Sequence, residues 1–198
     1  MGLVLYISLK IINTYLFKRR AQNYLSITPR EHRFVSYNKA KTILLLFESD
    51  YAENNQFIHK IIKQMQADGK KVSSWGFIDK KEIETAIFPD FRILHHKQTD
   101  LFHKPLESFI EELKSNTYDL LIDLTLKPII PLQYIELYAE AVFKTGIRKT
   151  ELPVYDFVLD VENVEAPDES SGSIENTVNE TYLFNQIIFY LKSIQTTD

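Results

Sequence analysis

The sequence predicts an α/β fold: a mostly parallel, Rossmann-like sheet of five to six strands with helices on both faces, preceded by an N-terminal helical arm. From residue 42 onward, short apolar runs alternate with segments of helical periodicity. The run TILLLFE at 42–48 is almost continuously apolar, as expected for a strand buried on both faces. The chain has 198 residues and 44% hydrophobic content, enough for one domain with a sizeable core.

We divide the chain into a basic amphipathic helical arm and linker at 1–41 and a Rossmann-like domain at 42–198. The arm begins GLVLYISLKIINTYLFKRR, in which Lys10, Asn13 and Thr14 share one helical face. The remaining surface is a wide apolar face that includes Leu3, Ile7, Ile11 and Leu16. Such a helix is typical of a membrane interface, but it also fits docking on its own domain or on a second copy. A membrane span is the least favoured alternative, because polar residues interrupt a run of only about 16 residues.

Charge is distributed very unevenly along the chain. Residues 1–41 hold eight basic residues against the single acid Glu31, a net charge of +7. Residues 42–198 hold 15 basic and 26 acidic residues, a net charge of −11. The arm is therefore expected to meet an anionic surface or partner. The candidate surface-binding residues are Lys18, Arg19, Arg20, Arg30 and Arg33.

The elements of the domain follow from periodicity and from turn residues. The expected strands cover residues 42–48, 70–78, 91–94, 118–124, 141–147 and 154–161. The expected helices cover residues 55–67, 105–115, 131–141 and 174–194. Residues 162–173, ENVEAPDESSGS, form an acidic loop between the last strand and the last helix.

Several carboxylates follow expected strands, where parallel sheets bind ligands. The candidate rim consists of Asp50, Asp123 and Asp160, with Glu48, Asp79 and Glu162 nearby in the sequence. One interpretation is a Mg²⁺ cluster that acts on a phosphorylated or sugar substrate. The favoured interpretation is that these acids cap helices or end strands; Asp79 and Glu82, for example, have capping-box spacing. We therefore assign no catalytic or metal residue.

Two absences narrow the range of functions. The first strand-to-helix turn, FESDYAENNQF, contains no glycine, so neither a dinucleotide fingerprint nor a P-loop can form there, and we expect no cofactor. The chain has no cysteine, which rules out disulfides and thiolate metal sites and fits a cytoplasmic location. His95, His96 and His103 match no fixed metal-ligand spacing.

Five segments resemble an uncharacterised family of short bacterial proteins with a domain of unknown function. They read AKTILLLFE, VSSWGFIDKKE, DLFHKP, YDLLIDLTLKPIIPLQYI and YDFVLDVE. The resemblance extends over residues 17–191 and implies a Rossmann-like body. It implies no activity, because the shared segments are structural and no catalytic residue is known for the family.

The best-supported expectation is a non-enzymatic binding or adaptor protein whose arm contacts an anionic membrane surface or an unknown protein partner. One alternative is the metal-dependent enzyme of the acidic rim. Another is an RNA- or ribosome-associated protein that uses residues 18–41, with Tyr24 and Phe34 available for stacking. A homo-oligomer is also open. We expect a cytoplasmic protein, with peripheral attachment to the cytoplasmic face of the membrane as an alternative.

Overall fold

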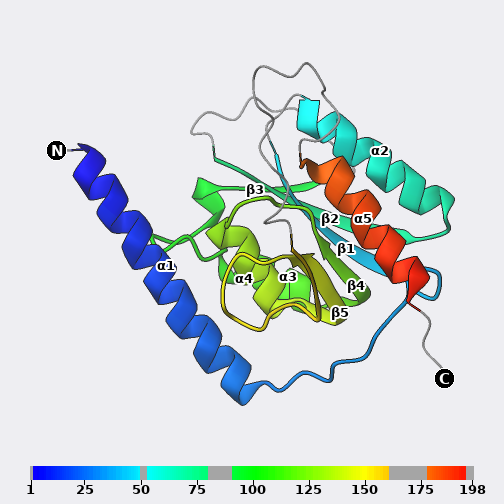
Figure 1. Cartoon of the computed structure of the whole chain (residues 1–198). Coiled ribbons are helices and arrows are strands. Elements are labelled where there is room, and N and C mark those ends of the chain that lie inside the picture. Colours follow the sequence, from blue (N-terminus) through cyan, green and yellow to red (C-terminus); the bar gives the residue numbers. More distant parts are fainter. Residues whose placement is uncertain (1, 50–52, 80–90, 161–177, 195–198) are drawn as a thin grey trace.

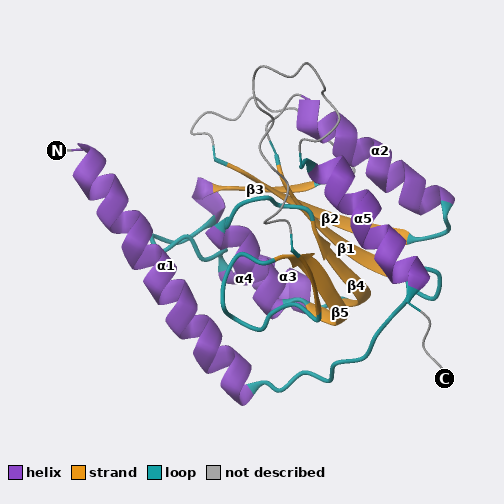
Figure 2. Cartoon of the chain, in the orientation of Figure 1, coloured by secondary structure: helices purple, strands orange, loops and turns teal. Residues whose placement is uncertain are grey.

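A computed structural model describes the backbone of residues 2–49, 53–79, 91–160 and 178–194, and the side chains of these except 2–10 and 53–55. Its centre is one six-stranded sheet in which all five pairs of neighbouring strands are parallel (Figures 1 and 2). The strand order is β3-β2-β1-β4-β5-β6, as in dinucleotide-binding Rossmann folds. The strands are β1 (Thr42–Glu48), β2 (Lys71–Ile78), β3 (Arg92–His95), β4 (Thr117–Asp123), β5 (Glu140–Ile147) and β6 (Phe157–Leu159).

Helices cover both faces of the sheet, so the predicted fold class is confirmed (Figure 2). On one face lie α2 (Glu53–Ala67) and α5 (Glu180–Ser193), and on the other α3 (Glu107–Lys114) and α4 (Ile130–Tyr138). The long helix α1 (Gly2–Ile27) lies outside these layers and contacts α4 (Figure 1). The molecule therefore has the three layers of a doubly wound fold and one additional helix.

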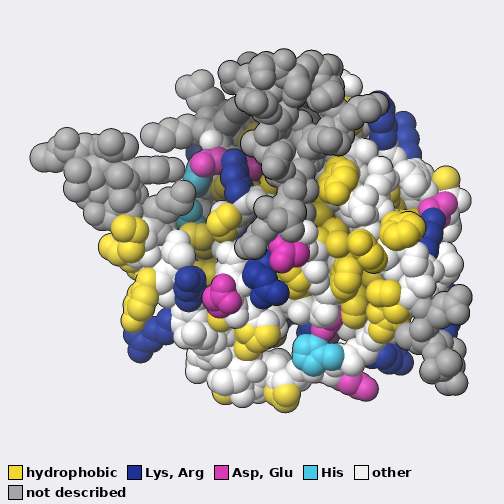
Figure 3. Space-filling view, in the orientation of Figure 1, with side chains coloured by type: hydrophobic (Ala, Val, Ile, Leu, Met, Phe, Trp, Pro, Cys, Tyr) yellow, Lys and Arg dark blue, Asp and Glu magenta, His cyan; other side chains and the backbone are white. Residues whose placement is uncertain are grey.

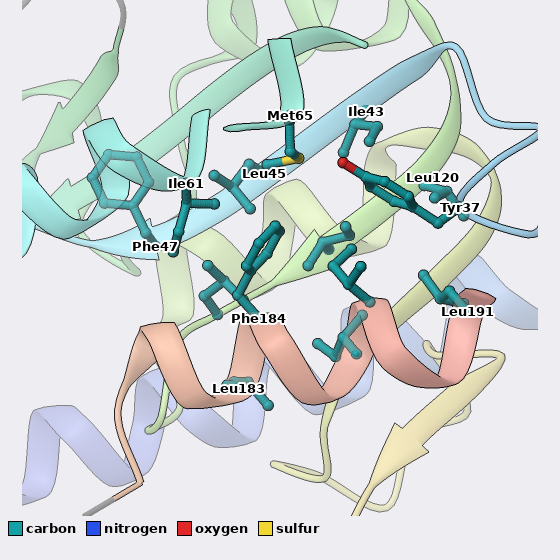
Figure 4. Packing of buried hydrophobic residues seen from close by; sticks show 14 of the residues in the cluster. Tyr37, Ile43, Leu45, Phe47, Ile61, Met65, Leu120, Leu183, Phe184 and Leu191 are labelled. Carbon is teal, nitrogen blue, oxygen red and sulfur yellow. The ribbon is translucent and has the colours of Figure 1, made fainter. Parts of the chain in front are cut away.

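Strand β1 contributes side chains to the core on both faces of the sheet, because successive side chains of a strand point to opposite faces. Ile43, Leu45 and Phe47 pack with α2 and α5 in one cluster, in which the three sets of side chains point toward one another (Figure 4). Leu44 and Leu46 belong to the cluster on the other face. A Cβ at Gly76 of β2 would lie 2.7 Å from the Phe47 ring, so only glycine fits there without displacing that side chain.

Residues 28–41 connect α1 to β1 and contact the domain along their length. Arg30 pairs with Asp156 at 2.8 Å, and the Phe34 ring packs edge-on against Phe143. Tyr37 is buried in the same core cluster as α2 and α5. The segment is irregular, as expected, but side-chain contacts bind it to the body. Whether residues 1–41 form a separate folding unit stays a prediction.

Most predicted boundaries agree with the structure within two or three residues. The helix α1 runs on to Ile27, since nothing before Pro29 breaks it. The strand expected at 154–161 is limited to β6, because Asp156 is engaged with the linker and with the backbone N–H of Lys144. The acidic loop expected at 162–173 lies outside the described residues. The helix start expected at Asp79 and Glu82 runs into another segment outside them.

Candidate functional site

A cavity of about 630 Å³ lies at the carboxyl ends of β1 and β2, with α1 forming one wall. Glu48 at the end of β1 lines it, as do Phe77 of β2 and residues 127–131 between β4 and α4. In open parallel sheets, ligands bind outside the carboxyl ends of the strands, where the strand order reverses. That reversal lies between β1 and β4 in this sheet. The cavity therefore occupies the place where Rossmann-like proteins bind ligands.

The wall formed by α1 is held in place by packing against α4. Phe17 and Ala21, one turn apart, are buried with Tyr134 and Leu137 of α4. The Phe17 and Tyr134 rings meet edge-on with centroids 5.0 Å apart, and the Arg20 guanidinium donates to the Tyr134 hydroxyl at 3.2 Å. These contacts fix the rotation of the helix about its axis.

That rotation turns the polar stripe of α1 toward the body. Asn13 lies one turn before Phe17 and is only 2% exposed, and both Asn13 and Thr14 line the cavity. Ile11, Ile12 and Tyr15 point away from the body, with 64%, 47% and 62% of their surface exposed. At the cavity, the helix thus presents Asn13 and Thr14 to its own protein, while Ile11, Ile12 and Tyr15 face the surroundings.

A cluster of buried ionisable side chains lies at the edge of the cavity. Asp123, the last residue of β4, is fully buried. Its Oδ2 accepts a hydrogen bond from the Tyr155 hydroxyl at 2.5 Å and contacts the ammonium of Lys149, which lines the cavity. Its Oδ1 accepts the Thr125 backbone N–H at 2.8 Å, which is a turn-stabilising contact of the expected kind. Lys149 also lies 3.6 Å from Glu136 of α4.

Burial controls the protonation of this cluster. It raises the pKa of Glu136 to about 8 and lowers the pKa of Lys144, whose Nζ donates to the Glu136 carbonyl, to about 7. It also lowers the pKa of Lys149 and raises the pKa of Tyr155. Each shift favours the neutral form, while the Asp123 carboxylate next to Lys149 favours the ammonium. Each charge of the ion pair therefore depends on the other, because both are buried and water cannot take the place of either partner.

The predicted acidic rim is not brought together in the described part of the chain. Asp123 is engaged with Lys149 and Tyr155, and Asp160 is exposed beyond β6, two strands away from β4 in the sheet. Asp50 lies outside the described residues. Among the residues described, no group of three or more histidine, aspartate or glutamate side chains is placed to hold a metal ion.

Histidines form another part of the cavity lining. His96, in the 3₁₀ turn His96–Gln98 after β3, pairs with Asp79, and its ring centroid is 5.3 Å from that of His103. Of the two adjacent histidines, only His96 lines the cavity together with His103. Burial and the nearby His96 lower the pKa of His103, so it is neutral near pH 7.

The candidate basic residues of the arm have different surroundings. Lys18, Arg19 and Arg33 are exposed. Arg20 is directed to Tyr134 and lies 5.6 Å from the centre of the Phe102 ring, and Arg30 pairs with Asp156. Two of the five residues therefore hold the arm on the body, and three remain accessible to a partner.

Sequence reasoning missed the most buried parts of this site. It did not single out Lys149, Tyr155 or Gln133, and it treated Asn13 only as part of a polar stripe. Lys149 follows directly after β5, so the rule that pointed to acids at strand ends would also have pointed to this lysine. Gln133 gave no signal, because its burial depends on where α1 docks.

The fold and the cavity define the class: a Rossmann-like α/β protein with a cavity at the switch point and no glycine-rich phosphate loop. Within that class, the model of a family of unknown function (DUF6913) matches residues 6–168, most of the chain, so the chain belongs to this family. No curated protein matches the chain, and no solved structure matches it. The resemblance to an uncharacterised family is thereby confirmed.

Proposed function

We propose that this protein is a non-enzymatic binding protein that attaches to an anionic membrane surface, on the cytoplasmic face, through the outer face of α1. That face consists of Ile11, Ile12, Tyr15, Lys18 and Arg19. Tyr15 is central: Ile11 and Ile12 lie one turn before it, and Lys18 and Arg19 one turn after it. The observation that carries the proposal is that all five side chains are exposed while Asn13, on the opposite side, is buried.

The outer face has the chemistry of an interfacial helix. Hydrophobic and basic side chains follow each other along α1 at the edge of the molecule (Figure 3). Insertion of the apolar side chains into the headgroup region buries them, and each lysine or arginine near an anionic surface adds about 1 kcal/mol. Over the part of the chain that the structure describes, no helix is both long enough and apolar enough to cross a membrane. The geometry therefore favours a helix lying on the surface.

The RNA alternative is less favoured, because its stacking residues are used within the protein. The Tyr24 ring packs edge-on against Tyr138 at 4.9 Å, and Phe34 packs against Phe143. The enzyme alternative is less favoured because the Asp123 carboxylate is occupied by Lys149 and Tyr155.

The experiment is co-sedimentation of the full chain with vesicles of phosphatidylcholine alone or mixed with phosphatidylglycerol. We expect binding to the anionic vesicles, weaker at high salt because the charge term is screened. Lys18→Gln with Arg19→Gln removes about 2 kcal/mol, about thirtyfold in the partition coefficient. Lys63→Gln on α2, another exposed lysine, is the matched control and should bind like the wild type.

The apolar part is tested by Ile11→Ser with Tyr15→Ser, which should weaken binding at every salt concentration. The matched control is Phe189→Ser on α5, because Phe189 is equally exposed at 61% but lies on another face. The proposal is wrong if the wild type ignores anionic vesicles or if the outer-face variants bind as well as the controls. Conversion of a dimer to a monomer by Ile11→Ser with Tyr15→Ser, without vesicle binding, would instead identify a second copy as the occupant.

A further inference from the structure

Two primary amides face the cavity from different helices. Asn13 comes from α1 and Gln133 from α4, and both side chains are almost completely buried, with 2% and 4% exposed. Asn13 lies one turn from Phe17, and Gln133 is next to Tyr134 in the chain. Because the Phe17 and Tyr134 rings are in contact, the two amides lie on neighbouring parts of the cavity wall.

One of these amides has an unsatisfied atom within the described part of the protein. The Asn13 Oδ1 is buried and has no hydrogen-bond partner there. Gln133 is 4% exposed and lines the same cavity from α4. A buried polar group without a partner lowers stability, so such groups are rare in folded proteins. An unsatisfied amide oxygen in the wall of a cavity that a second amide also lines indicates a ligand that supplies the missing hydrogen bond.

Of the described charged side chains that line the cavity, those other than the exposed Lys18 of α1 are already paired. Lys127 lies 2.7 Å from Glu48, His96 pairs with Asp79, and Lys149 pairs with Asp123. The remaining lining is largely apolar and includes the rings of Phe17 and Phe77. The cavity therefore lacks hydrogen-bonding partners for amides that lie among apolar and aromatic side chains.

A primary amide offers a donor and an acceptor side by side. The matching partner is a flat heterocycle that carries a donor next to an acceptor, as the edge of a purine does when asparagine or glutamine binds adenine. The first strand-to-helix turn, residues 47–57, has no glycine and so lacks the loop that cradles phosphates. We propose that the cavity between α1 and α4 binds a purine base or nucleoside through Asn13 and Gln133, without a requirement for phosphate.

The probes are adenine, hypoxanthine and adenosine, with indole as a control of similar shape that lacks the paired donor and acceptor. Isothermal titration calorimetry on the full chain should show saturable binding of at least one purine and at least tenfold weaker binding of indole. Two nearly isosteric variants test the amides: Asn13→Leu and Gln133→Met. Each should weaken purine binding at least tenfold, because a lost hydrogen bond in an apolar cavity is worth at least that factor.

The same variants have a second readout that separates binding from folding. Asn13→Leu removes the unsatisfied buried amide and should raise the melting temperature of the ligand-free protein, by about 2–4 °C for each kcal/mol gained. Asn23→Leu and Gln22→Met are matched controls on the exposed side of α1 and should change neither the affinity nor the melting temperature. All four variants should leave vesicle binding unchanged, so this test is independent of the membrane proposal.

Two outcomes would overturn the inference. The first is no detectable binding of any purine at millimolar concentration. The second is equal binding of indole and purines that Asn13→Leu and Gln133→Met do not change, which would make the cavity a general apolar site. Purine binding that both variants weaken, with higher stability of the ligand-free Asn13→Leu variant, would establish it.

Discussion

Polar groups at the two ends of the parallel sheet differ in whether their hydrogen bonds are satisfied within the protein. At the amino end, the Oδ2 of Asp119 accepts hydrogen bonds from the Lys41 N–H at 2.7 Å, the Thr42 N–H at 2.9 Å and the Thr42 hydroxyl at 3.1 Å. The Thr42 hydroxyl in turn accepts the Asp119 N–H at 3.0 Å. At the carboxyl end, Asn13 and Gln133 line a cavity, and the Oδ1 of Asn13 has no such partner among the described residues.

The difference separates structure from function within one fold. A fully satisfied polar group, such as Asp119, stabilises the junction between β1 and β4 and needs nothing further. An unsatisfied buried amide costs stability, and the fold tolerates that cost where a ligand completes the hydrogen bonds. The carboxyl end should therefore respond to substitution differently from the amino end.

The largest effect is expected at the buried ion pair at the edge of the cavity. Lys149→Met leaves the Asp123 carboxylate buried without its cation and should lower the free energy of unfolding by about 3–5 kcal/mol. The matched control is Lys127→Met, whose partner Glu48 is partly exposed, as is Lys127 itself, and whose loss should cost about 0–1 kcal/mol. Urea denaturation of the three proteins measures both values. Equal losses for the two variants would show that Lys149 is not needed to compensate Asp123.

A smaller effect is expected from the pH dependence of the amino end. Burial alone would raise the pKa of Asp119, but the hydrogen bonds from Thr42 and Lys41 outweigh burial and lower it. A lowered carboxyl pKa contributes stability that is present above the unfolded pKa of about 3.9 and is lost as the pH falls through the folded value. The advantage of the wild type over Asp119→Asn, about 1–2 kcal/mol at pH 6, should shrink toward pH 2. A difference that is constant from pH 6 to pH 2 would contradict this assignment.

The sheet and its covering helices were predictable because their patterns are local. The apolar run of β1 and the helical spacing of Ile58, Ile61 and Met65 both predict buried side chains, and the structure confirms both predictions. The position of α1 was not predictable, because Phe17 and Ala21 look like other apolar residues of that helix. Only the tertiary contact with Tyr134 determines which side of α1 faces inward.

The location of the candidate site was predictable from the sequence, but the contacts between its residues were not. The rule for parallel sheets located it at the carboxyl ends, where Asp123 does lie. Its chemistry depends on pairs distant in sequence, such as Asp123 with Lys149, which periodicity cannot show. Asn13 and Gln133 line one cavity only because α1, although far from α4 in the sequence, packs against it.

The most direct test compares one polar-to-apolar substitution at each end of the sheet by urea denaturation of the ligand-free protein. Thr42→Val removes satisfied hydrogen bonds and should lower the free energy of unfolding by about 1–2 kcal/mol. Asn13→Leu removes an unsatisfied buried amide and should raise the free energy of unfolding by about 1 kcal/mol. Opposite signs are the predicted result. If Asn13→Leu destabilises the protein as Thr42→Val does, the amide has a structural partner and the cavity is not built for a ligand.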